Sequence, residues 1–438
     1  MTSLPAGEFF VPARPAERSP PRERGAIEVF RGLLATYTVL ALTKIHEIVP
    51  LMDRLQPAKV IGVLLLVSAL TVIRGRALVT VLRTPAVACV GVILLLAILS
   101  VPGAVWPGNS VAFLTQEFWK TLLFFVIAMT GWCDRRTLRT SLRTLVVFES
   151  VVAVTLLAGA AKVLGGRAYV GQALDPNESA VHLLVVIPFA LQLVSDRGIW
   201  KIVGIAGTLL MVGGIVKTGS RAGFLGLVLL ACWLLVQVPG RRRVIVGLAI
   251  ASGAAVVMLT AGPAIRERFS TILHPTEDYN YTFREGRVNV WKRGLSYMAR
   301  RPFLGVGAQN FGVAEGVLSG KENVGYGVKY SAAHNVFIQV GAELGVFGLV
   351  AFVRLLWVAA AASRRLRKVA RQLAARGVEV ARQEASLAEA ALGGMVALLV
   401  GGFFLSIAYE PITFFVVAVC VALRLGTPLR QWPQAVAA

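Results

Sequence analysis

The chain has 438 residues, of which 56% are hydrophobic and 16% are charged, and its mean hydropathy is +0.71. A soluble protein rarely has this composition, so long apolar runs with charges between them predict an all-α polytopic membrane protein. The net charge of +22 would suggest nucleic acid in a soluble protein. Here the basic residues gather in short connections, where Lys and Arg mark the cytoplasmic side, so we expect no nucleic-acid partner.

The first 28 residues are rich in Pro, Arg and Glu and contain no apolar core, which predicts a disordered cytoplasmic tail and no cleaved signal peptide. After them, apolar runs of about 20 residues, or fewer at the margin, predict membrane-spanning helices. Twelve spans are expected near residues 30–51, 58–73, 85–103, 118–132, 143–162, 179–195, 200–216, 222–238, 243–261, 336–361, 389–407 and 411–424. Spans one to nine thus occupy residues 29–261, a large loop occupies 262–335, spans ten to twelve occupy 336–424, and a tail occupies 425–438.

The connections between these spans alternate in charge. One set is basic and includes RGRALVTVLR (74–83), CDRRTLRTSLR (133–143), GRRR (240–243) and SRRLRKVARQLAAR (363–376). The other set is nearly without Lys and Arg, so the basic set is expected on the cytoplasmic side together with both termini. This orientation places the 262–335 loop on the outer, non-cytoplasmic side.

The four cysteines lie within or beside apolar runs and show no CxxC spacing. Disulfides and a zinc site are therefore not expected.

The large loop contains a candidate amphipathic helix within YTFREGRVNVWKRGLSYMARRPFLG (281–305). Its apolar residues recur at helical spacing at Val288, Trp291, Leu295 and Met298. We expect a short helix on the membrane surface, ended by Arg300-Arg301-Pro302.

Arg221 opens the eighth span, directly after the turn formed by Gly219 and Ser220. A helix N-terminus attracts anions, and an adjacent arginine adds a planar fork that fits phosphate oxygens. The alternative is an interfacial anchor whose side chain reaches toward lipid headgroups.

Arg284 and Arg287 are three residues apart and so could share one helical face, with Trp291 four residues beyond Arg287. This pattern indicates a second clamp on an anionic group, held at the interface by the indole. It is equally typical of a solvated basic face that contacts anionic lipid.

His334 lies where a polar loop becomes an apolar helix, directly before Asn335. An imidazole can exchange a proton with a hydroxyl near neutral pH, so His334 is a candidate catalytic base. The alternative is a histidine that only forms hydrogen bonds at the interface. Glu343 lies nine residues further on, roughly 13 Å along a helix, and we expect it to pair with another span.

DPNESA (175–180) precedes the sixth span, where Asn177 or Ser179 can cap the helix. A sugar-facing role for Asn177 is the weaker alternative. The sequence has no phosphate loop of the GxxxxGK[ST] type, no HExxH and, in the loop, no DxD pair, so neither a metal nor another cofactor is expected.

Four segments resemble, in the same order, the O-antigen ligase and O-antigen polymerase superfamily of bacterial membrane glycosyltransferases. They are DPNESA, TGSRAG (218–223), REGRVNVW followed by RPFLGVGAQNF (284–311), and AHNVFIQVGAELGVFGL (333–349). The resemblance implies transfer of a glycan from undecaprenyl pyrophosphate to lipid A–core, or to another carrier-linked chain, at the periplasmic face of the inner membrane, without ATP or metal. It implies catalytic roles for Arg221, Arg287 and His334. Arg284 competes with Arg287, and Glu410 is a candidate acceptor contact.

Two other transferases are consistent with the same residues, and a transporter is the alternative that is not an enzyme. A polysaccharide polymerase or a protein O-glycosyltransferase differs only in the acceptor. A twelve-span transporter would require charged residues deep within the spans, whereas Lys44, Glu47 and Lys120 lie towards the outer ends.

Overall fold

The computed structural model describes residues 21–47, 50–159, 162–164, 167–169, 174–238, 240, 243–244, 247–248, 286–320 and 330–427. Within these residues, six helices are long and apolar enough to cross a membrane, or up to seven if the bent pair Pro57–Val72 and Gly75–Leu82 forms one span. The prediction of an all-α, multi-pass membrane protein is therefore confirmed, while the count of twelve spans and the side that the large loop faces remain predictions.

The elements follow one another along the chain in two groups. The first comprises α1 (Pro21–Thr43), η2 (Ile45–Glu47), α2 (Pro50–Leu55), α3 (Pro57–Val72), α4 (Gly75–Leu82), α5 (Pro85–Leu99), α6 (Pro107–Ala112), η3 (Phe113–Phe118), α7 (Trp119–Gly131), α8 (Arg135–Leu157), β1 (Lys162–Leu164) and β2 (Arg167–Tyr169). The second comprises α9 (Pro176–Leu193), α10 (Ile199–Lys217), α11 (Arg221–Gln237), α15 (Arg287–Arg300), α16 (Phe311–Gly320), α17 (Val336–Ala375), α18 (Glu379–Phe404) and α19 (Pro411–Leu425).

A helix overlaps each of the first eight and the last three expected spans. The ninth, residues 243–261, lies mostly outside the described residues. The fourth is longer than expected because the helical path runs through the π-helical η3 from Pro107 to Gly131. The first helix begins at Pro21, within the segment expected to be a tail, and residues 1–20 lie outside the described part.

The core of the bundle forms around α19, which is buried almost throughout from Ile412 to Leu423 because its side chains are nearly all apolar. It contacts α7, α17 and α18. Phe414 meets the ring of Phe125, and Phe415 meets Trp132, in edge-to-face contacts typical of aromatic packing.

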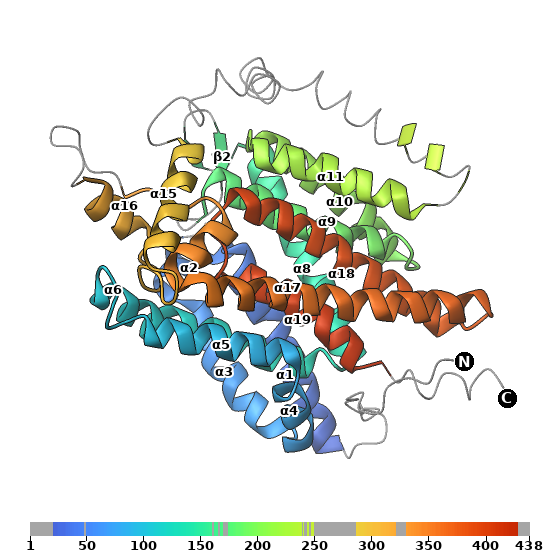
Figure 1. Cartoon of the computed structure of the whole chain (residues 1–438). Helices are drawn as coiled ribbons and strands as arrows, with labels where there is room; N and C mark the ends of the chain where they lie inside the picture. The colour runs from blue at the N-terminus through green and yellow to red at the C-terminus, as the bar shows by residue number, and fades with distance from the viewer. Residues whose placement is uncertain are drawn as a thin grey trace.

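Different elements form the two ends of the bundle (Figure 1). At one end, here called the α15 end, lie the short helices α6, α15 and α16 and the strand β2. At the other, the α17–α18 end, these two long helices join through Gly377. The hairpin is antiparallel, with Val163 opposite Ala168, and was not expected from the sequence.

Candidate functional site

The first turns of α9 and α11 meet at the α15 end through the Asn177 side chain. Its Oδ1 accepts hydrogen bonds from Arg167 Nη2 at 2.7 Å and from Ser220 Oγ at 3.0 Å. The Ser220 hydroxyl also accepts the N–H of Gly223 at 3.1 Å and so caps α11. Asn177 thus joins two helix starts and the hairpin strand β2.

The expected cap of α9 was placed on the wrong residue. Asp175 is the cap, because its Oδ1 accepts the N–H groups of Asn177 and Glu178 at 2.6 and 2.8 Å. Glu178 completes a capping box by accepting the N–H of Asp175. This leaves the Asn177 side chain available to bind Arg167 and Ser220.

Arg221 is the first residue of α11, as the sequence predicted, and it is half-buried. A second arginine, Arg167, lies at the same corner and donates its Nε–H to Thr218 O at 3.0 Å. The corner therefore combines two guanidinium groups with a helix N-terminus, an arrangement that favours an anion.

His334 and Asn335 form the entry to α17. The Asn335 Oδ1 caps the helix by accepting the N–H groups of Phe337 and Ile338, and its Nδ2 donates to Phe403 O at 3.2 Å. His334 has a left-handed backbone with φ of 50°, and its N–H donates to Ser406 Oγ at 2.8 Å. The backbone of His334 is thereby held against the connection between α18 and α19, and its side chain is half-buried.

Helix α15 confirms the expected amphipathic helix and its end at Arg300, but its buried face differs from the expected one. Val290, Gly294 and Tyr297 are buried, whereas Leu295 is 49% exposed. The helix packs against α17 and α16, so its buried residues are those that face these two helices.

Two expected loop residues of α15 lie beside the entry to α17. Trp291 donates its Nε1–H to Ala333 O at 3.0 Å, and its ring meets Phe403. The guanidinium carbon of Arg287 lies 6.0 Å from the centre of the Phe404 ring. Arg287 and His334 therefore both adjoin residues 403–406, while Arg284 lies outside the described residues.

Helix α17 is broken at Gly345, whose φ of 70° and ψ of −170° are not helical. The segment 301–310 replaces the missing helical hydrogen bonds. Val306 and Gly307 donate to the carbonyl groups of Ala342 and Glu343, and Val346 donates to Pro302 O, at 2.8 to 3.1 Å. The first turns of α17 are thus bound to the polar segment that precedes α16.

Glu343 does not pair with another span as expected. Its two carboxylate oxygens accept the N–H groups of Gln309 and Phe311, each at 3.1 Å. A buried carboxylate needs donors, and here the backbone of the same polar segment supplies them.

The last turn of α18 lies between α9 and α17. A side chain at Gly401 would collide with Val181 of α9, and one at Gly402 would touch Val336 of α17. The Asn177–Arg221 corner and the His334–Arg287 pair consequently lie on either side of this turn, at the same end of the bundle.

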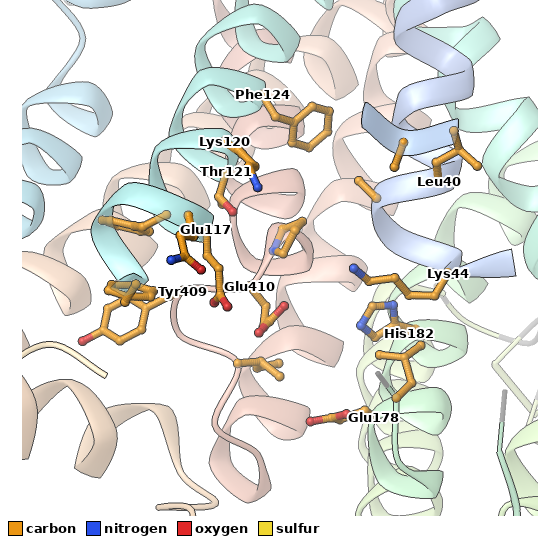
Figure 2. A pocket seen from close by; sticks show the side chains of 18 of the residues that line it. Leu40, Lys44, Glu117, Lys120, Thr121, Phe124, Glu178, His182, Tyr409 and Glu410 are labelled. Carbon is orange, nitrogen blue, oxygen red and sulfur yellow. The ribbon is translucent and has the colours of Figure 1, made fainter. Parts of the chain in front are cut away.

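A cavity of about 440 Å³ opens beside this turn, between α1, η3, α7, α9 and the connection from α18 to α19 (Figure 2). Lys44 reaches in from α1, while Glu117 and Lys120 come from the helical segment opposite. Ser406, which binds the His334 backbone, and Glu410 line it as well. The cavity therefore adjoins His334.

The predicted contact residue Glu410 lies in a mixed electrostatic field. Its side chain is accessible from the cavity but has protein around it, and this loss of hydration raises the pKa of its carboxyl above the ordinary value. The nearby Lys44 ammonium opposes the rise in pKa, and the Glu117 carboxylate adds to it.

Sequence patterns missed Arg167, Lys44, Glu117 and Lys120. The hairpin that carries Arg167 is too short and too irregular to be recognised from periodicity. The other three were visible as charges near span ends, and this position was the available signal. Their convergence depends on which helices are neighbours, which spacing along the chain does not reveal.

Residues 206–353 match a family model described as O-antigen ligase. The match confirms the resemblance over three of the four ordered motifs, with Arg221, Arg287 and His334 within it, whereas DPNESA lies outside the matched residues. No curated protein matches the chain.

Proposed function

Since residues 206–353 identify this chain with the O-antigen ligase and polymerase superfamily, we propose that it transfers a glycan from undecaprenyl pyrophosphate to lipid A–core. The transfer takes place at the periplasmic face of the bacterial inner membrane. The match over the segment that holds Arg221, Arg287 and His334 is the observation that carries the proposal.

Arg221 and Arg287 stabilise the leaving group. When the bond between the anomeric carbon and the phosphate oxygen breaks, the electron pair stays with the carrier pyrophosphate. Charge-assisted, bidentate bonds from guanidinium groups are among the strongest hydrogen bonds available to a protein. In a site with little water they are strengthened further, so two arginines supply the stabilisation without a metal ion.

His334 acts as the general base. The acceptor hydroxyl attacks the anomeric carbon opposite the leaving pyrophosphate, and its proton passes to the imidazole, so the configuration at that carbon is inverted. The backbone bond of His334 to Ser406 and the Asn335 cap support this role, because they fix the point at which the ring leaves the chain.

Further residues orient the substrates. Trp291 and Asn335 hold the His334 entry in place, and Asn177 orients the helix starts beside Arg221. Arg284 is a second candidate for the loop arginine, and Glu410 contacts the acceptor. The polyprenyl tail lies along the apolar outer faces of the helices.

Exchange of His334 for Ala tests the proposal. In a strain whose own copy is deleted, we expect the variant to insert normally and to lower glycan on lipid A–core at least 100-fold. Gel analysis of lipopolysaccharide measures this loss. Surface glycan of wild-type amount and length would show that His334 is not the base.

The same deletion strain separates a ligase from the alternative, a polymerase of O-antigen or exopolysaccharide. A ligase defect leaves long chains on the carrier and none on lipid A–core. A polymerase defect leaves single repeats on lipid A–core.

A further inference from the structure

The four charged side chains Lys44, Glu117, Lys120 and Glu410 converge on the cavity without pairing with one another. Within the described part of the chain, none of them makes a side-chain hydrogen bond or an ion pair. The more deeply buried side chains of Arg135 and Glu384, by contrast, are paired at 2.8 Å. Glu117, Lys120 and Glu410 are exposed and Lys44 is half-buried where they line the cavity, so these charged groups are accessible to a partner from outside the chain.

The charges around the cavity disfavour a pyrophosphate as that partner. Three carboxylates, those of Glu117, Glu178 and Glu410, face two ammonium groups, and like charges repel a polyanion. A sugar ring fits both signs, because each hydroxyl can donate to a carboxylate and accept from an ammonium group. Amide and hydroxyl groups complete the lining at Gln309, Gln339, Thr121 and Ser406.

The cavity also has an apolar wall suited to the carbon face of a sugar. Tyr37 and Phe124 line it, with their ring centres 5.4 Å apart. The cavity lining is mainly polar, and these two rings add an apolar surface to its carboxylates, ammonium groups and amides.

The cavity begins next to the proposed base. Ser406 lines it and accepts the backbone N–H of His334 at 2.8 Å. One turn further along α17, Gln339 lines it too, and its Oε1 accepts the N–H of Ala408. A hydroxyl of a sugar seated here therefore lies on the side of His334 that faces the α18–α19 connection.

We infer that this cavity is the subsite for the terminal sugar of the acceptor. Glu117 and Glu410 accept hydrogen bonds from its hydroxyl groups, and Lys44 and Lys120 donate to its oxygens. The inference rests on the proposed function and adds a division of labour, in which arginines on α11 and α15 hold the donor pyrophosphate and the mixed-charge cavity holds the acceptor.

Steady-state kinetics, with the donor and the acceptor varied in turn, test whether the two substrates bind at these separate places. The enzyme in nanodiscs is assayed with carrier-linked glycan and lipid A–core, both extracted from the deletion strain. We expect Glu117→Gln and Glu410→Gln each to raise KM for lipid A–core about tenfold, because each loses a charge-assisted bond. The kcat and the KM for the donor stay within about twofold. Glu379→Gln, on an exposed residue at the start of α18, is the matched control and leaves every constant unchanged.

The outcomes separate the inference from the proposed function. An unchanged KM for the acceptor, or a rise only in the KM for the donor, overturns the inference while the transfer itself stands. If wild-type enzyme does not modify lipid A–core but extends carrier-linked glycan, the ligase proposal fails. The acceptor titration is then made with that glycan, and the same rise in KM is required.

A binding measurement independent of turnover uses the His334→Ala variant. Acylation of Lys44 and Lys120 by an amine reagent is followed by mass spectrometry, with delipidated core oligosaccharide or free repeat-unit saccharide present. We expect either saccharide to slow acylation of both lysines and to leave the exposed Lys201 of α10 unaffected. Equal rates with and without both saccharides overturn the inference.

Discussion

Charged residues at the α17–α18 end and those around the cavity at the α15 end serve different purposes. At the α17–α18 end, Arg135 of α8 binds Glu384 of α18 and donates to Leu423 O and Thr427 of the α19 segment. At the α15 end, Lys44, Glu117, Lys120 and Glu410 surround a cavity and make no such bonds among the described residues. Paired charges hold helices together, whereas unpaired charges around a hollow are available to a substrate.

We expect the largest loss of stability when the ion pair between Arg135 and Glu384 is broken. Glu384→Ala leaves the Arg135 guanidinium without its carboxylate in a site where the two side chains are only 18% and 6% exposed. Removing one partner of a buried pair costs about 3–5 kcal/mol. Denaturant unfolding in detergent measures the change.

The matched control for this variant is Glu379→Ala. Glu379 pairs with Arg382 at 3.1 Å, but both side chains are more than two-thirds exposed, so the loss should stay below about 1 kcal/mol. Equal stability of the Glu384→Ala variant and the wild type would refute the contrast between the two ends.

At the α15 end, we expect exchange of Arg221 for Lys to change turnover and not stability. The positive charge remains, but the planar fork is lost, and a transition-state contact of this kind is worth about 3–4 kcal/mol, or 100- to 1,000-fold in kcat. Steady-state transfer assays measure the rate. Full activity would mean that a point charge suffices beside the α11 N-terminus.

Gly345→Ala is expected to lower both the stability of the protein and its turnover. A side chain at Gly345 would lie 2.4 Å from Pro302 O, in a backbone conformation that only glycine adopts readily. We expect a loss of about 1–3 kcal/mol in stability together with reduced transfer, because the Gly345 break positions the His334 entry. Gly32→Ala, in open space on α1, is the control and should leave stability unchanged or slightly raised.

The smallest expected effect is a dependence of protein stability on pH through the Glu410 carboxyl group. The pKa of Glu410 is raised in the folded protein by burial, so the folded state holds this proton more tightly than the unfolded chain. The stability linked to Glu410 is therefore complete below the unfolded pKa and is lost as pH rises through the folded pKa. Melting temperatures of wild type and Glu410→Gln, compared across this range, should diverge in favour of the variant as pH rises; a constant difference would contradict the pKa shift.

Much of this fold could be predicted from hydropathy, because an apolar run of about 20 residues in a membrane satisfies its backbone hydrogen bonds by forming a helix. The α15 helix and the position of Arg221 at a helix start also follow from local spacing. The face that α15 buries could not be predicted, since Leu295 and Val290 are both apolar and only contact with α17 distinguishes them.

In the candidate site, too, local positions could be predicted from the sequence, whereas contacts between distant segments could not. His334, Asn335 and Trp291 were chosen from their place along the chain; Trp291 bonds to Ala333, directly before His334, and the roles of all three stay predictions. Glu343 was assigned the wrong kind of partner, because a backbone segment can satisfy a carboxylate as well as a side chain can. The cavity was not foreseen, because it forms from elements that are distant in sequence.

The break at Gly345 separates the proposed base from the transmembrane part of its own helix. The turns that follow His334 are fastened to residues 301–310, whereas the longer part of α17 lies among the apolar helices. Helices adjust to lipid thickness by tilting. Such tilting can be absorbed at the glycine, so the imidazole keeps its distance from the substrates when the surrounding bilayer becomes thinner or thicker.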